Sequence, residues 1–297
     1  VTAGVGAQGS LKAESQMAQL SARQGAVSAT MAAVHAAQTA ADDVFRKAAL
    51  DAAIFGHVNV LEALLEDNST LLSPRYVTSR FIDEAMCAAV EAGQLAVLEA
   101  LVQRGANVSA PVAKWRGDVP LMKAARNGYS NLVRYLLGLP CNVLDQVPVK
   151  EQSSLVAAAS NAGSVESVES LVQAGVKADG ALVAASKAGH VAVASVLLES
   201  RARIDEVDPL GWQPIHFSAW NGHVRLTHWL VEHNASLEVK NGGTLAAELG
   251  DDFAFPTKRL SDGRRPLHLA AESGHVSVVQ ILATARAMLA PKTNPPG

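Results

Sequence analysis

The sequence predicts an all-α repeat fold, a solenoid of stacked helix–turn–helix units, and three observations lead to this prediction. A turn glycine followed by apolar residues at offsets 2, 4, 5, 8 and 9 returns along the chain. These marker glycines are Gly56, Gly93, Gly128, Gly163, Gly189, Gly222 and Gly274, with a weaker copy at Gly25. The intervals between them, from Gly25 onward, are 31, 37, 35, 35, 26, 33 and 52 residues. Offset 8 is Leu in all seven clear copies. A period near 33 residues is typical of units that each touch only their neighbours.

Each unit is expected to contain two helices, the first ending just before the marker glycine and the second starting at or just after it. A small pair stands four and three positions before most markers, which lets neighbouring units pack at short range. These pairs are Ala52-Ala53, Ala124-Ala125, Ala185-Ser186, Ser218-Ala219 and Ala270-Ala271. Twelve residues after several markers stand residues that tolerate the left-handed conformation closing a helix, namely Asn68, Gly105, Gly175 and Asn234.

These segments resemble ankyrin repeats. The resemblance is carried by Pro266-Leu267-His268-Leu269-Ala270-Ala271 with Gly274-His275, by Pro214-Ile215-His216 with Gly222-His223, by Pro120-Leu121 with Gly128, and by Arg104-Gly105-Ala106-Asn107-Val108. It implies an ankyrin-type α-solenoid of L-shaped units, each with two antiparallel helices and a short β-hairpin finger. The inner helices and fingers would form a concave surface that binds other proteins. His216 and His268 resemble the family's structural hydrogen-bonding histidine.

The resemblance covers roughly 42–289, and we expect about seven repeats there. Residues 11–41 are expected to be a degenerate N-terminal capping repeat, 1–10 a flexible leader and 290–297 a C-terminal tail. Three departures are expected inside the array. The second helix of the third unit should stop early at Gly138, before Pro140. The 26-residue interval should reduce one finger to a tight turn around Asp179-Gly180, and the 52-residue interval should place an insertion near 241–260. Two interpretations of that insertion have equal weight: a loop that binds a partner, and a finger extension that packs on itself.

Composition argues against several classes of partner. A formal net charge of −3 with 18% charged residues carries no electrostatic signature of nucleic-acid binding, and no apolar run is long enough to insert across a membrane. The two cysteines, Cys87 and Cys141, fall in different repeats, which favours reduced thiols. We therefore expect a cytoplasmic or other reducing intracellular compartment, with organellar import left open.

No catalytic constellation, metal site or cofactor site is predicted, and we expect the protein not to be an enzyme. Residues 4–9 match G-x-G-x-x-G, but a dinucleotide site needs a preceding strand and a βαβ unit, and only three residues precede the match. An enzyme that needs such a cofactor is set aside unless a nucleotide raises the melting temperature. His223, His228 and His233 are five residues apart, so they do not share a helix face as zinc ligands would.

The binding surface is expected at the two positions before each marker glycine and in the fingers, because the packing of the repeat does not require those side chains. The candidate protein-binding residues are Phe55, Trp115, Arg116, Asp118, Arg126, Asn127, Leu210, Trp212, Trp220, Asn221, Arg264 and Glu272. Aromatic and Arg side chains are common anchors of protein interfaces. The alternative for each Trp in this set is that it packs on a neighbouring finger. Trp229, in the apolar seam of a second helix, is expected in the core.

The predicted function is that of a non-enzymatic interaction module, an ankyrin-repeat scaffold that presents a preformed concave groove to a protein partner. The alternative is an architectural subunit built permanently into a large macromolecular assembly, which the shortened finger, the insertion and the Ala-rich N-terminal region would suit. The residues do not indicate which protein is bound.

Overall fold

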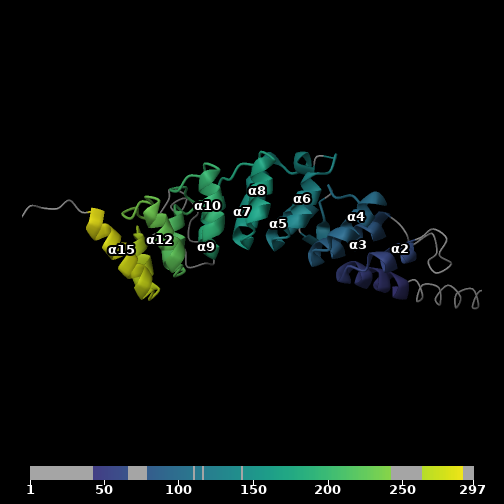
Figure 1. The fold of residues 1–297 in the computed structure, drawn as a ribbon, viewed down its shortest axis with the longest axis horizontal. Helices are drawn as coiled ribbons and strands as arrows, with labels where there is room; N and C mark the ends of the chain where they lie inside the picture. The colour runs from purple at the N-terminus through teal and green to yellow at the C-terminus, as the bar shows by residue number, and fades with distance from the viewer. Residues whose placement is uncertain are drawn as a thin grey trace, which may run out of the picture.

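The architecture is a single row of helix pairs, seen in a computed structural model (Figure 1). It describes residues 43–65, 79–109, 111–115, 117–141, 143–241 and 263–289. Within these ranges the helices form seven pairs, which we number as units one to seven. The pairs are residues 43–55 with α2 (Val58–Leu65), α3 (Ser79–Ala92) with α4 (Leu95–Gln103), α5 (Pro120–Asn127) with α6 (Ser130–Leu137), α7 (Val149–Ala162) with α8 (Val165–Gln173), α9 (Ala181–Ala188) with α10 (Val191–Glu199), α11 (Pro214–Trp220) with α12 (Val224–Glu232), and α14 (Pro266–Glu272) with α15 (Val276–Leu289).

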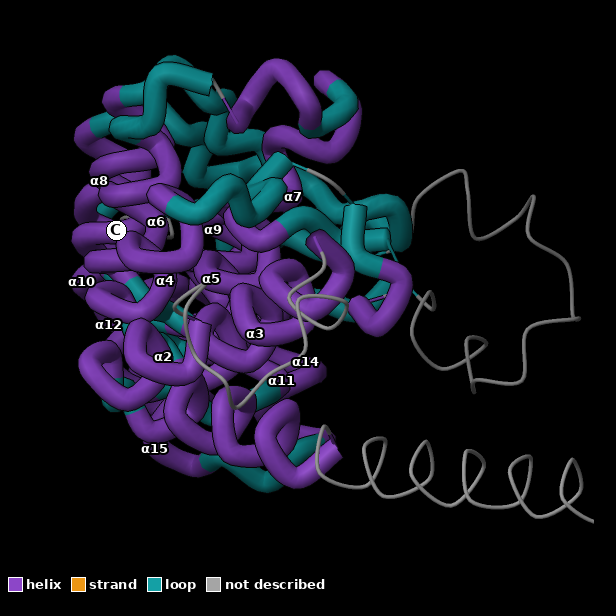
Figure 2. Tube along the Cα trace, turned by 90° about the vertical axis from the view of Figure 1, so that its right-hand side faces the viewer, coloured by secondary structure: helices purple, strands orange, loops and turns teal. Residues whose placement is uncertain are grey.

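The pairs stack side by side into an arch made of two layers of helices. Figure 1 shows α3, α5, α7 and α9 along the inner side of the arch, with α4, α6, α8 and α10 along its outer side. Figure 2, turned by 90°, shows the same two layers, with loops projecting beyond the first helices. The predicted all-α solenoid is confirmed.

Each marker glycine forms the turn inside a helix pair. All seven have φ between +74° and +83°, a left-handed conformation that costs a residue with a Cβ free energy. The backbone N–H of the following residue then bonds back to the carbonyl oxygen four positions before the glycine. Examples are the bonds from Tyr129 to Ala124 at 3.0 Å and from His275 to Ala270 at 2.9 Å. The glycine is therefore required by the helix-ending geometry and recurs with every unit.

The core lies between successive pairs and is filled by the apolar offsets. Six of the seven offset-8 leucines are buried: Leu101, Leu136, Leu171, Leu197, Leu230 and Leu282. Leu64 is the exception, since it is only partly buried while Leu61 and Leu65 fill the core of unit one. Small residues such as Ala125 and Ala185 are fully buried, which lets the first helices of adjacent units approach closely.

The fingers are loops held by turns, and no strand occurs in the residues that the structure describes. The expectation of β-hairpin fingers is therefore not met in these ranges. The finger before α5 contains a short 3-10 helix, η1 (Ala113–Trp115), and is closed by a hydrogen bond of 3.0 Å from the backbone N–H of Val112 to the carbonyl oxygen of Asp118. The finger before α11 is closed at Asp208, whose carboxylate accepts from the backbone N–H groups of Leu210 and Trp212.

Two of the predicted irregularities are confirmed. Helix α6 ends at Leu137 with Gly138 as its C-cap, before Pro140, as predicted. The chain then forms a second 3-10 helix, η2 (Val143–Gln146), before α7. Between α8 and α9 the finger is replaced by a tight turn, in which Gly180 is left-handed at φ +76°. The expected leader 1–10, capping repeat 11–41, insertion near 241–260 (except Asn241) and tail 290–297 lie outside the described residues.

Candidate protein-binding surface

The inner side of the arch carries one side chain per unit at the end of the first helix, two positions before the marker glycine. We call this set the inner row. Its members are Ile54, Glu91, Arg126, Asn161, Lys187, Trp220 and Glu272. The predicted binding residues Arg126, Trp220 and Glu272 belong to it.

Charged members of the inner row are paired with the fingers. Arg126 binds the carboxylate of Asp118, and Glu272 binds the guanidinium of Arg264. Lys187 lies more loosely beside a finger carboxylate, with its Nζ 3.9 Å from Asp208 Oδ2. Each pair is partly exposed, so it contributes little to folding but fixes the finger relative to the helix end.

Glu91 binds two side chains of the finger before α5. It accepts from Lys114 Nζ at 2.8 Å and from Trp115 Nε1 at 2.7 Å. Burial acts to raise the pKa of Glu91, but the hydrogen bonds from Lys114 and Trp115 and the charge of Lys114 together lower it. The carboxylate is thus held in its charged form at neutral pH by the finger it orders.

The expectation that Trp115 projects into the groove is corrected by these contacts. Its side chain is 7% exposed, and its only polar atom is used by Glu91. Trp115 is instead packed, as in the alternative given for each Trp. Its bond to Glu91 holds the finger against the end of the first helix.

Unit six concentrates aromatic side chains on the inner side. Trp212 is 2% exposed, and its ring lies 4.9 Å from that of Phe217 and 6.1 Å from that of Trp220, measured between centroids. Trp212 is therefore also packed within its unit, against Phe217 and Trp220, and does not project into the groove. Trp220 and Phe217 are half-buried, and Lys187 Nζ lies 4.4 Å above the Phe217 ring. This cluster leaves aromatic surface and a cation accessible together.

The remaining predicted binding residues are dispersed along the arch. Phe55 is 68% exposed at the unit-one end, and Asn127 is exposed in unit three. Leu210 is half-buried in the finger before α11, and Asn221 donates from Nδ2 to the carbonyl of Lys187 at 2.9 Å. Arg116 lies outside the described residues. Trp229, expected in the core, is partly buried on the outer layer, where it stacks on His233.

Sequence reasoning missed a ladder of contacts that joins successive units. The side chain just after a marker glycine covers the marker glycine of the preceding unit and reaches the carbonyl two positions before it. The contacts are Gln94 to Ile54 at 3.0 Å, Tyr129 to Glu91 at 3.2 Å, His190 to Asn161 at 3.2 Å, His223 to Lys187 at 3.0 Å and His275 to Trp220 at 3.0 Å. The signal was present, because four histidines follow marker glycines, but the bonded carbonyl belongs to another unit. The ladder ties the ends of these first helices to the following units.

The ladder has a gap between units three and four. Ser164 follows Gly163 there, and its short side chain caps its own helix by accepting from Ser167 N at 3.3 Å. No bond from Ser164 to unit three occurs among the described residues.

The two histidines of the Pro-x-His segments have local structural roles. His216 Nδ1 accepts from the backbone N–H of Gln213 at 3.0 Å, and His268 Nδ1 accepts from that of Arg265 at 3.3 Å. Burial lowers the pKa of His216, which keeps it neutral and able to accept. Across the described ranges no group of three or more His, Cys, Asp and Glu side chains could hold a metal ion. None of the helices seen there is both long and apolar enough to cross a bilayer.

Comparison with known proteins agrees with this architecture. Models of ankyrin repeats match residues 155–241 (three copies), 86–137 (many copies) and 262–289 (a single repeat). The crystal structure of the human ASB11 ankyrin repeat domain superposes with a TM-score of 0.57 at 24% identity, covering 84% of this chain and 99% of that one. The chain belongs to the ankyrin-repeat family.

Similar proteins of known sequence share only part of their length with this chain. A probable E3 ubiquitin-protein ligase, XBOS32 of Oryza sativa subsp. japonica, is 28% identical over 54% of this chain and 36% of its own length. Human ankyrin repeat and SOCS box protein 3 is 30% identical over 35% of this chain and 17% of its own length. The chain thus spans about a third of the first relative and less than a fifth of the second. Ankyrin repeats generally mediate protein–protein interaction and are typically non-enzymatic.

Proposed function

We propose that this chain is a binding scaffold that presents its inner row and fingers to a protein partner, with Trp220 as the main anchor. The observation that carries the proposal is the aromatic cluster of unit six. Trp220 is half-buried, its ring is held edge-on against Trp212, and Lys187 lies over the adjacent Phe217. Half-buried aromatic side chains on a rigid support lose little entropy on binding, and Trp is enriched among residues that dominate interface energy.

The rest of the inner row supports the same role. The contacts of Glu91 with Lys114, of Arg126 with Asp118 and of Arg264 with Glu272 hold fingers against helix ends before any partner arrives. A preformed surface avoids much of the ordering cost of association. The carboxylates and cations of these pairs remain partly exposed, so a partner can add contacts to them without dismantling the row.

The experiment compares two tryptophans of the same unit. Partners are captured by affinity purification and identified by mass spectrometry, and one is purified and titrated against the Trp220→Ala and Trp229→Ala variants. Trp229 is the matched control because it is also partly buried but lies on the outer helix α12. We expect Trp220→Ala to weaken binding by about 2 kcal/mol or more, or roughly thirtyfold, and Trp229→Ala to leave affinity nearly unchanged.

A second variant, which leaves the core unchanged, separates loss of binding from loss of folding. Asn127 is exposed at the end of α5, so Asn127→Arg adds bulk to the inner side without disturbing packing. Asn127→Arg should also lower the affinity for the partner, while the melting temperature of the variant stays at the wild-type value. If wild type, Trp220→Ala and Asn127→Arg bound the partner with equal affinity, the proposal that the inner side is the binding surface would be wrong.

A permanent architectural subunit is the second candidate, favoured by the missing finger between α8 and α9, which breaks the regularity of the array. The two candidate functions differ in how readily the bound partner exchanges with free partner. A scaffold should release its labelled partner when unlabelled partner is added in excess, whereas an architectural subunit should remain in a salt-resistant complex.

A further inference from the structure

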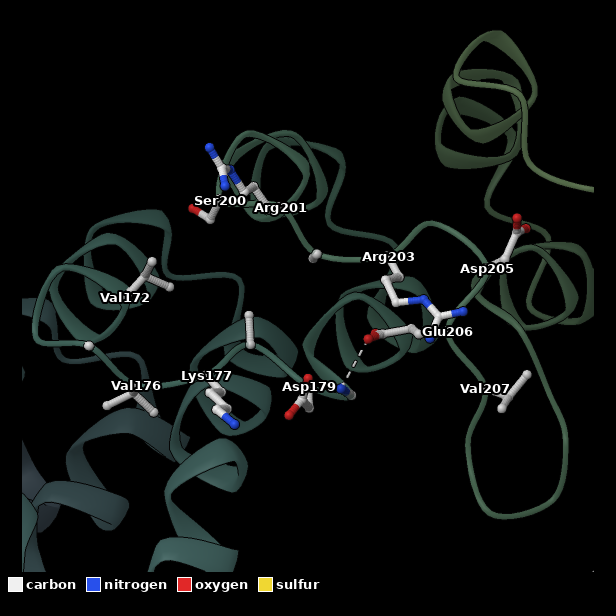
Figure 3. Close-up of a pocket in the computed structure, with 14 residues that line it drawn as sticks. Val172, Val176, Lys177, Asp179, Ser200, Arg201, Arg203, Asp205, Glu206 and Val207 are labelled. Carbon is white, nitrogen blue, oxygen red and sulfur yellow. Dashed lines mark hydrogen bonds between the residues drawn. The ribbon is translucent and has the colours of Figure 1, made fainter.

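The missing finger leaves an opening between two loops of the array. An open cavity of about 580 Å³ lies between residues 172–180, which end unit four, and residues 200–207, which follow α10 of unit five (Figure 3). A full-length finger after α8 would stand beside the loop after α10. Because that finger is reduced to the turn at Asp179-Gly180, the space beside the second loop is open.

One residue at the rim of this cavity has an unusual backbone. Arg201 has φ +67°, in the left-handed region, and stands twelve residues after its marker glycine. The same place in three other units holds Gly105, Gly175 and Asn234, residue types that adopt this conformation at low cost. An Arg here costs folding free energy relative to Gly. Strained residues of this kind concentrate at functional sites, and this one lines the cavity.

Three cations line the cavity, and none of them forms an ion pair within the part of the chain that the structure describes. Lys177 comes from the first loop, Arg201 and Arg203 come from the second, and all three are exposed. No carboxylate lies within ion-pair distance of any of them among the described residues. In the inner row, by contrast, Arg126 and Lys187 each have a carboxylate partner.

The carboxylates of the cavity are mostly occupied by backbone groups. Glu206 accepts from the N–H groups of Gly180 at 3.1 Å and Val183 at 2.9 Å, and Figure 3 shows the first of these bonds. Asp205 Oδ1 accepts from the backbone N–H of Ser236 at 3.3 Å. Asp179 is the remaining carboxylate that lines the opening. Glu206 and Asp205 are thus engaged by backbone donors, whereas the three cations have no ion-pair partner among the described residues, although the lining as a whole holds three cations and three acids.

We propose that this cavity is a second binding site, which takes an acidic peptide segment of a protein partner. The carboxylates of the segment would bind Arg201, Arg203 and Lys177, and an apolar side chain of the segment would cover Val207, which is 60% exposed at the opening. The site shares no residue with the inner row, so it extends the proposed function and does not depend on Trp220.

The test uses a fluorescein-labelled decapeptide of alternating Glu and Leu, titrated into the full chain at low ionic strength and followed by fluorescence anisotropy. A peptide of alternating Gln and Leu is the charge control. We expect saturable binding of the Glu peptide alone, weakened roughly five- to tenfold in Arg201→Gly/Arg203→Gln because two partly exposed ion pairs are lost. Asp179→Asn should strengthen binding, since it removes one of the three acids that line the cavity beside the cations.

The matched control removes two cations elsewhere. Arg134 and Arg225 are exposed on outer helices, so Arg134→Gln/Arg225→Gln changes the net charge equally. It should leave the affinity unchanged, as should Trp220→Ala, which separates this site from the inner row. Arg201→Gly alone should lower affinity while raising the melting temperature, a combination that a purely structural role does not produce. Absence of binding, equal loss in both double variants, or a lower melting temperature for Arg201→Gly would overturn the proposal.

Discussion

Glu206 is a single carboxylate that organises the start of a helix. It accepts hydrogen bonds from Gly180 and Val183, which supply backbone donors at the N-terminal end of α9. Burial is the larger influence on this group and raises the pKa of Glu206, while the backbone hydrogen bonds act to lower it. In the folded chain the carboxyl therefore holds its proton to higher pH than in the unfolded chain.

This shift predicts a pH dependence of a defined sign. Above the unfolded pKa the folded state binds more protons than the unfolded state, so this group's contribution to stability declines as pH rises through the folded pKa. Glu206→Gln removes the titration but keeps an acceptor. We expect the unfolding free energy of the variant relative to wild type to rise between pH 4.5 and 7, measured by urea denaturation. A difference that is constant or falls with pH would contradict the shift.

The two cysteines differ in environment, and this difference is testable by labelling. Cys87 is buried in α3, and burial raises its pKa to about 11, whereas Cys141 is exposed. Only the thiolate reacts readily, so at pH 8 a chromogenic disulfide reagent should modify Cys141 quickly and Cys87 only after unfolding. Cys141→Ser should abolish the fast phase. A fast phase of two equivalents would show that α3 opens more readily than its packing indicates.

At the scale of elements, the ladder joins the ends of first helices from successive units. At every junction except that between units three and four, a side chain from the new unit crosses to the carbonyl end of the preceding first helix, as His190 does over Gly163. An added Cβ on Gly163 would lie 2.7 Å from the His190 ring, so glycine serves both the left-handed turn and this close approach. The turn and the interface between units therefore depend on the same residue.

Removing one contact of the ladder should have a modest, measurable effect. His190→Ala leaves the Asn161 carbonyl without this bond and is expected to lower the unfolding free energy by about 1 kcal/mol. His228→Ala is the control, because His228 is exposed on the outer layer beside Glu232 and its loss should cost little. Equal effects in chemical denaturation would mean that the ladder contributes nothing beyond surface hydrogen bonding.

At the scale of the whole molecule, a linear array confines the effects of a mutation. Leu136 is fully buried on α6, which packs against α4 and α8 of the neighbouring units. Leu136→Ala should cost about 2–5 kcal/mol through the cavity it leaves. Because each unit contacts only its neighbours, amide exchange should quicken in units two to four and stay slow in α14 and α15.

Leu137→Ala is the matched control for this prediction, since Leu137 is adjacent on the same helix but only partly buried. Its effect should be clearly smaller. Uniform loss of protection along the chain in Leu136→Ala would indicate a single cooperative core and would contradict the nearest-neighbour description.

How far sequence reasoning reached differs between the fold and the candidate site. The marker glycines, the helix pairs, the early end of α6 at Gly138 and the turn at Asp179-Gly180 were predicted correctly. All of these depend on residues close together in the chain, since left-handed turns and apolar periodicity are local properties. The β-hairpin fingers were inferred from family resemblance and are absent from the described residues. The selection of partner-binding residues stays a prediction.

What the sequence determined by itself is the stack of units, because each copy repeats the same turn glycine, small pair and apolar offsets. Only the tertiary structure decided which large side chains are available to a partner. Trp212 in the finger and Trp220 at the end of the first helix were both predicted to face the groove, yet one is buried and the other half-buried, because the exposure of each depends on how the finger and the helix pack together. The same holds for Arg201, whose rim position exists because a finger belonging to another unit is missing. Local patterns specify backbone geometry, whereas exposure is a property of the assembled array.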